Sequence, residues 1–278
     1  MVELKPMELG EILDGAMTLY RRHFGLMLRL GVIALWIPAS LNIYLQVTGG
    51  PLQHGGLYIL AAILQYFCAL FLTAGAIQII SDSYLGKVTA LRQAVSLGAS
   101  KILPLFGVGL GKGLLIGLMA GVIGVVAAVA IPAFGSSAGG AGLLVFLVAI
   151  LAGIWAVAFV ACGYAVTTQV VVLEPLDAAF DSFGRSWELT RGFKRKVANV
   201  AIVAGIIFNV PVAVVSGMAQ GMALSDPGLS AGLAVLAALL PIVLTPLLAC
   251  VFTLMYYDLR IRREGFDLQV LSQQLVSS

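Results

Sequence analysis

The chain has 278 residues, of which 60% are hydrophobic and only 10% are charged. Soluble domains carry about 25% charged residues, so this composition excludes an ordinary soluble domain. The mean hydropathy of +1.04 reflects repeated apolar stretches, each long enough to cross a hydrocarbon layer of about 30 Å. We therefore expect residues 1–278 to form a single polytopic membrane domain without an appended catalytic module.

The first predicted element is an amphipathic helix over residues 7–23. Its apolar residues recur at the three- and four-residue spacing of one helix face, and most of its charges lie off that face. This pattern is typical of a helix that lies on a membrane surface. The start of the chain has no basic segment followed directly by an apolar core, so we do not expect a cleaved signal peptide.

Two apolar stretches, 24–46 and 57–81, are long enough to cross the membrane and return. The second unit has a short, mildly amphipathic segment at 88–101, followed by a glycine-rich apolar stretch at 102–132. A further apolar stretch at 143–173 is longer than a bilayer requires. For residues 102–132 the pattern allows either one long tilted span or a span with a re-entrant part.

The third unit begins with the clearest surface helix, over residues 176–192. Two more apolar stretches follow it, at 200–222 and 231–257. The surface helix is predicted to place aromatic residues on one side and charged residues on the other. These residues are Phe180, Phe183, Trp187 and Thr190 on the first side, and Asp181, Arg185 and Glu188 on the second.

The sequence thus predicts an all-α integral membrane fold with six transmembrane helices arranged as three hairpins. Each hairpin is preceded by an amphipathic surface helix on the cytoplasmic side. The three pseudo-repeat units cover residues 1–86, 87–173 and 174–265, and residues 266–278 form a polar cytoplasmic tail.

The basic residues predict the orientation of this arrangement. All 16 Lys and Arg residues lie on one side of it or close to the helix ends there, and none lies in the three opposite loops. Cytoplasmic segments of membrane proteins carry an excess of Lys and Arg. We therefore expect both termini to lie in the cytoplasm.

Glycine recurs every four residues along the stretch at 102–132. In a membrane helix, residues four apart share a face, and glycines on that face allow a second helix to approach to backbone contact. We interpret this face as a helix-packing site; the alternative is a loose glycine-rich helix that faces lipid. The packing residues are Gly109, Gly113, Gly117 and Gly121.

Basic residues supply the candidate contacts to anionic lipid. Lys112 lies about two turns inside the glycine-rich stretch, where its amine either reaches the membrane surface or meets a buried carboxylate or a lipid headgroup. A basic run directly follows the aromatic surface helix and suits anionic headgroups, although such a run also sets topology. The candidate contacts are Lys112, Arg191, Lys194, Arg195 and Lys196.

Two ion pairs are predicted at the cytoplasmic end of the last span. Asp258 and Arg262 are four residues apart on one helix face, as are Arg260 and Glu264 in the reverse order. We expect these pairs to make the helix rigid where it leaves the membrane.

Signatures of catalysis and metal binding are missing from the sequence. It contains no HExxH, GxSxG or P-loop motif. His23 and His54 are predicted at opposite membrane faces, and Cys68, Cys162 and Cys250 lie in apolar stretches where packing is their expected role. No carboxylate lies near the middle of a span, which argues against coupling to protons or sodium ions. We expect no catalytic residue, no metal and no cofactor.

Three stretches of the chain resemble a known bacterial family, the one named after the membrane domain of glycerophosphoryl diester phosphodiesterases. They are ELGEILDGAMTLYRRHFG, VVVLEPLDAAFDSFGRSWELTRG and YYDLRIRREGFDLQ. The residues that carry the resemblance most specifically are Glu174, Ser186, Trp187, Leu189, Tyr257, Asp258, Arg260, Arg262, Glu264 and Gly265.

This resemblance implies a helical domain of the bacterial inner membrane, which in some members is fused to a phosphodiesterase barrel. The His-Arg-Gly start of that barrel is absent here, because His23 is followed by Phe24 and His54 by Gly55. The resemblance therefore supports fold and location, and the phosphodiesterase activity is not expected.

The glycine face, the surface helices and the missing catalytic groups favour a non-enzymatic scaffold or interaction subunit. It would act through helix packing and contact with anionic lipid. Its expected partners are membrane lipids and either a second copy of the chain or another membrane protein, whereas nucleic acid is not expected. The alternative is a transporter or carrier of a lipid or small amphiphile, which proline-kinked spans and Lys112 would serve.

Overall fold

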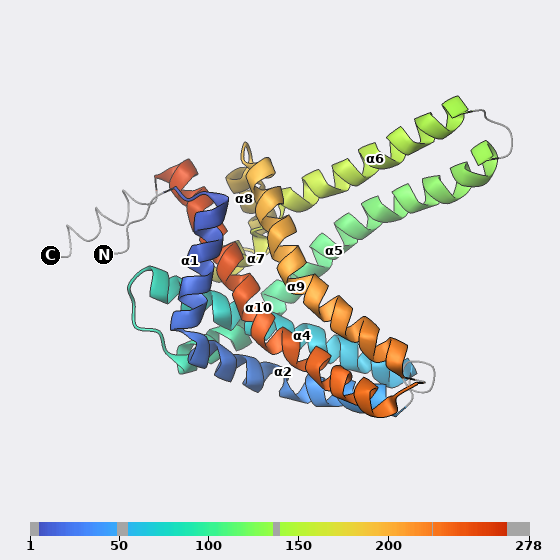
Figure 1. The fold of residues 1–278 in the computed structure, drawn as a ribbon. Coiled ribbons are helices and arrows are strands. Elements are labelled where there is room, and N and C mark those ends of the chain that lie inside the picture. The colour runs from blue at the N-terminus through green and yellow to red at the C-terminus, as the bar shows by residue number, and fades with distance from the viewer. Residues whose placement is uncertain (1–5, 49–54, 136–139, 224, 266–278) are drawn as a thin grey trace.

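The computed structural model describes residues 6–48, 55–135, 140–223 and 225–265, and every regular element in these ranges is a helix. Six of the helices are long and apolar enough to cross a membrane, which confirms the predicted fold class at that level (Figure 1). The predicted tail at 266–278 lies outside the described residues, as do Lys5, His54 and parts of the predicted outer loops.

The helices follow one another with short connections. Their apolar stretches form helices because a backbone without water must satisfy its hydrogen bonds within the segment. The elements are α1 (Leu9–Arg22), α2 (Phe24–Val47), α4 (Gly55–Tyr84), α5 (Leu91–Gly135), α6 (Gly140–Gly163), α7 (Thr167–Leu173), α8 (Asp181–Thr190), α9 (Lys194–Met222) and α10 (Pro227–Glu264).

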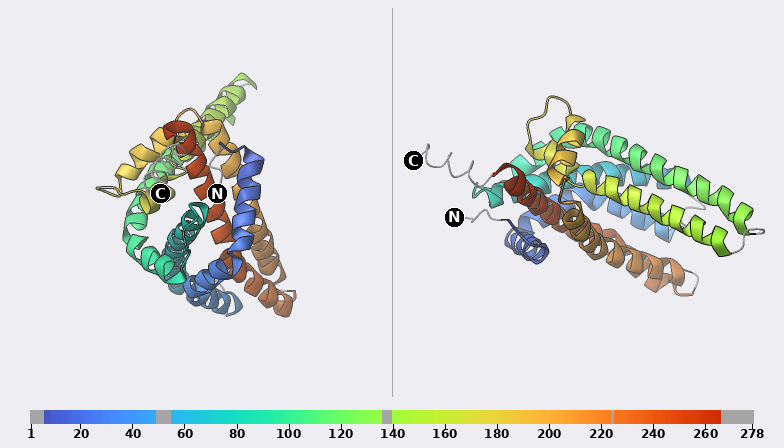
Figure 2. Two further views of the ribbon diagram at one scale, coloured as in Figure 1. Left: turned by 90° about the vertical axis from the view of Figure 1, so that its left-hand side faces the viewer. Right: turned by 90° about the horizontal axis from the view of Figure 1, so that it is seen from above.

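Successive long helices pack against each other: α2 against α4, α5 against α6, and α9 against α10. Helix α10 also packs against α2 and α4. The four long helices α2, α4, α9 and α10 therefore form one bundle. The first part of α5 packs against α4, whereas its later part extends with α6 away from the bundle (Figure 1). Figure 2 shows the same α5/α6 pair from the end and from above.

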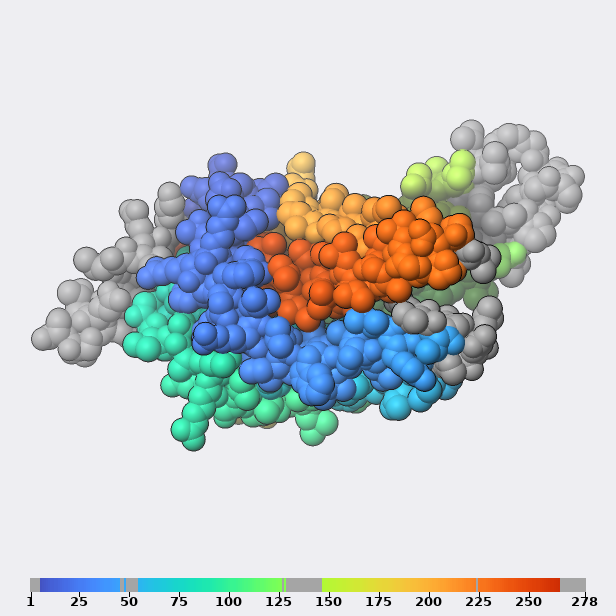
Figure 3. Space-filling view, turned by 60° about the horizontal axis from the view of Figure 1, so that its bottom comes forward, coloured from blue at the N-terminus to red at the C-terminus, as the bar shows by residue number. Residues whose placement is uncertain are grey.

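The buried core centres on the C-terminal halves of α4 and α10, and α1, α7 and the first parts of α2, α5 and α9 pack around them. Ile12, Ala16 and Tyr20 of α1 are spaced four residues apart and are buried. The Tyr20 hydroxyl donates a hydrogen bond of 2.9 Å to the carbonyl of Val243 in α10. The predicted apolar stripe of α1 therefore packs on the protein itself, and Figure 3 shows α1 beside the red half of α10.

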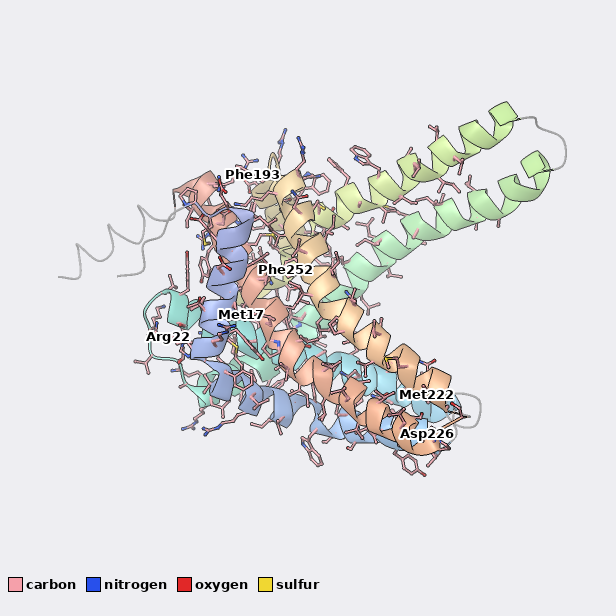
Figure 4. All side chains as sticks on the ribbon, in the orientation of Figure 1. Met17, Arg22, Phe193, Met222, Asp226 and Phe252 are labelled. Atoms are coloured by element: carbon pink, nitrogen blue, oxygen red, sulfur yellow. The ribbon has the colours of Figure 1, made fainter. Side chains whose placement is uncertain are left out.

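The two ends of the bundle differ in character. Figure 4 shows Arg22 and Phe193 toward the end of the bundle where both chain termini lie, and Met222 and Asp226 at the opposite end. The Asp226 carboxylate accepts a hydrogen bond from the N–H of Leu229 and so caps α10. The basic residues of α1, of the first turn of α9 and of the last turns of α10 all belong to the Arg22 end.

One predicted boundary is wrong. The segment 88–101 is not a separate surface helix, because α5 runs without a break from Leu91 to Gly135. A Cβ on Gly98 would lie 2.9 Å from the carbonyl oxygen of Phe71, so this segment continues the close contact between α4 and α5. The unbroken helix also leaves no re-entrant part in the stretch at 102–132.

The predicted stretch at 143–173 contains a candidate membrane span from Leu147 to Leu173, and within it the helix is divided after Gly163 into α6 and α7. The carbonyl of Gly163 accepts hydrogen bonds from Ser186 (2.9 Å) and Thr190 (3.2 Å), both of α8. The Trp187 ring also lies so close to Gly163 that a Cβ there would collide with it. The docking of α8 therefore stabilises the break between the two helices.

Candidate functional site

A buried carboxylate joins the start of the chain to the ends of α9 and α10. Asp258 is fully buried and accepts hydrogen bonds from the Met7 N–H (2.7 Å) and from Nε of Arg262 (3.0 Å). It also forms an ion pair with Lys196 of α9. The Met7 carbonyl accepts hydrogen bonds from both Lys196 and Arg262, so the cations and the carboxylate satisfy each other. This cluster is a structural clamp.

A second polar network lies between α8 and α10. Nε of Arg185 donates to Glu174 over 2.9 Å, and Arg185 also pairs with Glu264. The Tyr256 hydroxyl donates to Glu174 over 2.8 Å, and Nε of Arg260 donates to Glu264 over 3.0 Å. Burial acts to lower the pKa of Arg185, but its bonds to the two carboxylates outweigh burial and raise that pKa above its ordinary value.

Both predicted ion pairs form, Asp258 with Arg262 and Arg260 with Glu264. Sequence spacing could predict only these pairs, because both partners of each pair lie four residues apart on one helix. The cross-helix partners Lys196 and Arg185 were not predicted, because they come from other parts of the chain.

The sequence did not predict which face of α8 meets the bundle. Of the predicted aromatic side, Thr190 is fully buried, whereas Phe180 is 59% exposed. The hydroxyls of Ser186 and Thr190 donate hydrogen bonds to the carbonyl of Gly163, and the hydroxyl of Ser182 donates to the carbonyl of Ala179. The buried residues are Ser182, Ser186, Leu189 and Thr190.

The predicted lipid-contact residues fall into two groups. Lys196 is committed to Asp258, and Nζ of Lys194 lies 3.3 Å from the ring centre of Phe159 and 3.4 Å from that of Trp187. Stacking between two aromatic rings stabilises a buried ammonium group without a hydrogen-bond acceptor. Arg191 and Arg195 are exposed. Contact with anionic lipid remains a prediction, and of these basic residues Arg191 and Arg195 are the best placed to make it.

The predicted glycine face is oriented mostly away from its own chain. A Cβ on Gly109 would collide with the Tyr66 hydroxyl, so this glycine is needed for the contact between α5 and α4. A Cβ on Gly113, Gly117 or Gly121 would meet no atom of the described residues within 4 Å. Packing through these three glycines therefore requires an occupant other than the described part of the chain.

A groove of about 530 Å³ follows this open face of α5. The glycines form its floor and exposed aliphatic side chains form its walls, of which Leu118 is 68% exposed. The lining residues are Gly113, Leu114, Gly117, Leu118, Gly121, Val122, Val125 and Val126.

A cavity of about 510 Å³ between α4, α5 and α7 adjoins this groove, because Gly113 and Gly117 line both. It contains three polar groups: the Lys112 amine and the hydroxyls of Tyr66 and Thr168. Across the described ranges, none of the three has a hydrogen-bond or ion-pair partner. The described ranges therefore show no carboxylate paired with Lys112, and its contact with a buried carboxylate or a lipid headgroup remains a prediction.

Neighbouring elements position the hydroxyl groups of this cavity. The Tyr66 ring contacts the edge of Phe106 at 6.2 Å between ring centres. Thr168 belongs to α7, whose separation from α6 depends on the hydrogen bonds that Gly163 accepts from α8. The sequence showed Lys112 as unusual, but it carried no signal that Tyr66 and Thr168 lie beside it.

A smaller, mostly apolar cavity of about 190 Å³ lies between α1, α9 and α10. Met17 and Asp14 of α1 line it, and Figure 4 shows Met17 on the α1 helix. No group of three His, Cys, Asp or Glu residues that could hold a metal ion is present in the part of the chain that the structure describes. The Lys112 cavity and its groove are therefore the strongest candidate site.

No family model, no curated protein and no solved structure matches this sequence.

Proposed function

We propose that this protein is a non-enzymatic, multi-pass protein of the bacterial inner membrane whose open α5 face binds a component of the membrane. The observation that carries the proposal is the Lys112 residue, which has no hydrogen-bond or ion-pair partner among the described residues and lines a cavity that continues into an apolar groove. An amphiphile has the same combination of a polar group and an apolar chain. The resemblance to the phosphodiesterase membrane-domain family agrees with this location, and the distribution of basic residues favours both termini in the cytoplasm.

An amphiphile accounts for the site better than a transmembrane helix does. A lysine inside the hydrocarbon layer is costly, up to about 2.5 to 3.5 kcal/mol at the bilayer centre on insertion scales, and a polar headgroup would offset the cost for Lys112. An apolar helix packed on the glycines would leave the amine without a counter-ion. Lipid binding would make the protein a carrier or a lipid-dependent interaction subunit.

The test uses a lipid with a photoactivatable acyl chain, incorporated into membranes that contain the full chain. We expect covalent labelling on α5 between Gly113 and Val126, and we expect the Gly117→Leu variant to lose it because leucine fills the groove floor. Gly205→Leu is the control, since its Cβ would meet only the side chain of Asn209, at 3.8 Å. Labelling that is spread evenly over all the lipid-facing helices would contradict the proposal.

A scaffold that packs through α5 is the second candidate, because Gly113, Gly117 and Gly121 form an open face with four-residue spacing. If a second copy of α5 occupies this face, cross-linking in membranes will give a dimer, and the double variant Gly113→Leu and Gly117→Leu will be monomeric. An unchanged oligomer or complex in that variant would rule out the glycine face as the contact.

A further inference from the structure

We infer that the amphiphile is anionic, with its headgroup in the Lys112 cavity and one acyl chain along the glycine groove. This inference rests on the proposed function, that the open α5 face binds an amphiphile. It adds the charge of the ligand and the direction in which the ligand lies.

The polar groups of the cavity fit an anionic headgroup. The Lys112 amine comes from α5, the Tyr66 hydroxyl from α4 and the Thr168 hydroxyl from α7, and all three line the same cavity. A phosphate or carboxylate oxygen can accept a charge-assisted hydrogen bond from the amine and further bonds from the two hydroxyls. A choline headgroup would instead bring a second cation close to the amine.

The groove fits one acyl chain. From Gly113 to Val126 the helix rises about 20 Å at 1.5 Å per residue, which exceeds half of a hydrocarbon layer of about 30 Å. The missing side chains of Gly113, Gly117 and Gly121 leave the floor open, and aliphatic residues line the sides. A single extended chain can therefore lie against the helix backbone over its full length.

The direction of the ligand follows from the direction of α5. Lys112 precedes the groove in the chain, so the headgroup lies toward the start of α5 and the acyl chain toward its end at Gly135. The start of α5 packs against the buried half of α4, which belongs to the end of the bundle where Met7 binds Asp258. In the proposed orientation, this end of the bundle is the cytoplasmic one. The ligand would therefore lie as a lipid of the cytoplasmic leaflet does, with its headgroup toward the cytoplasm.

The experiment is a lipid titration of the purified full chain, followed by native mass spectrometry. The probes are phosphatidylglycerol, its single-chain lyso form, phosphatidylcholine and inorganic phosphate. We expect one tightly bound molecule of either glycerol lipid, binding of phosphatidylcholine at least about tenfold weaker, and no retention of phosphate alone. Equal retention of inorganic phosphate would overturn the role of the acyl chain.

Variants of the cavity test the headgroup contact. Lys112→Gln should weaken phosphatidylglycerol binding at least about tenfold and remove the preference over phosphatidylcholine, whereas Lys112→Arg should keep the preference. Arg21→Gln is the matched control, because it removes an exposed cation of α1 that does not line the cavity and is not a candidate lipid contact. Tyr66→Phe and Thr168→Val each remove one hydroxyl and should weaken phosphatidylglycerol binding several-fold. These two variants test the headgroup contact if Lys112→Gln does not fold.

The outcomes separate this inference from the proposed function. Equal binding of phosphatidylglycerol and phosphatidylcholine, with both lost in Gly117→Leu, would overturn the anionic headgroup and leave amphiphile binding intact. Unchanged binding in Lys112→Gln, or equal weakening in Arg21→Gln, would also overturn the inference. Absence of any lipid bound at the α5 face would overturn the proposed function itself.

Discussion

The N–H of Met7 donates a hydrogen bond of 2.7 Å to the carboxylate of Asp258, which lies 251 residues later in the chain. This bond brings both ends of the described chain together at one end of the bundle. Because Asp258 is fully buried and also binds Lys196 and Arg262, its single negative charge is shared between two cations. Loss of this side chain would leave the Met7 N–H and both cations without their shared acceptor.

We expect Asp258→Asn to lower the stability by about 3–5 kcal/mol, since it leaves two partly buried cations without their carboxylate. Denaturant unfolding in detergent measures the effect. Asp226→Asn is the control, because asparagine caps a helix about as well as aspartate and should leave stability nearly unchanged. Equal stability of the two variants would show that the clamp contributes nothing.

Close approach of α2 to α10 depends on one glycine. A Cβ on Gly31 would lie 2.8 Å from the carbonyl oxygen of Ile242, whereas a Cβ on Gly25 would meet nothing within 4 Å. We expect Gly31→Ala to destabilise the protein by about 1–3 kcal/mol through overpacking and Gly25→Ala to cost nothing. Thermal unfolding of the two variants side by side checks this, and a drop in Tm for Gly25→Ala alone would contradict the packing.

His23 makes the stability depend on pH. Burial and the neighbouring Arg22 lower its pKa from the ordinary value of 6.5, and its Nε2 lies 2.7 Å from the Ser83 hydroxyl. As the pH falls below about 6.5, the unfolded chain takes up a proton at this residue before the folded protein does. The contribution of His23 therefore makes the protein less stable as the pH falls through this range.

The measurement is Tm between pH 7.5 and 5.5 for the wild type and for His23→Gln. We expect a shallower loss of Tm in the variant, because glutamine does not titrate. A loss that is equally steep in the variant would assign the pH dependence to other groups.

Labelling of single cysteines tests the proposed orientation. The background replaces Cys68, Cys162 and Cys250 with alanine, and the variants Ser225→Cys and Arg195→Cys place thiols at opposite ends of the bundle. In bacterial spheroplasts, a membrane-impermeant maleimide should label Ser225→Cys directly and Arg195→Cys only after lysis, because basic residues remain in the cytoplasm. The reverse pattern would invert the topology.

Several features followed from the sequence because they depend on neighbouring residues. The number of spans follows from the length of apolar stretches, and the helices α1 and α8 follow from periodicity and polarity. The ion pairs of Asp258 with Arg262 and of Arg260 with Glu264 follow from their four-residue spacing. The one-sided distribution of basic residues likewise needs no coordinates.

The tertiary structure decided which face of each apolar helix meets the protein. Lipid tails are as apolar as a neighbouring helix, so hydrophobicity alone does not distinguish the two sides of a membrane span. For this reason Gly31 lies in a tight helix contact while Gly113 and Gly117 face outward, although all three lie in similar apolar surroundings. Only the crossing of α4, α5 and α7 brings the hydroxyl groups beside Lys112.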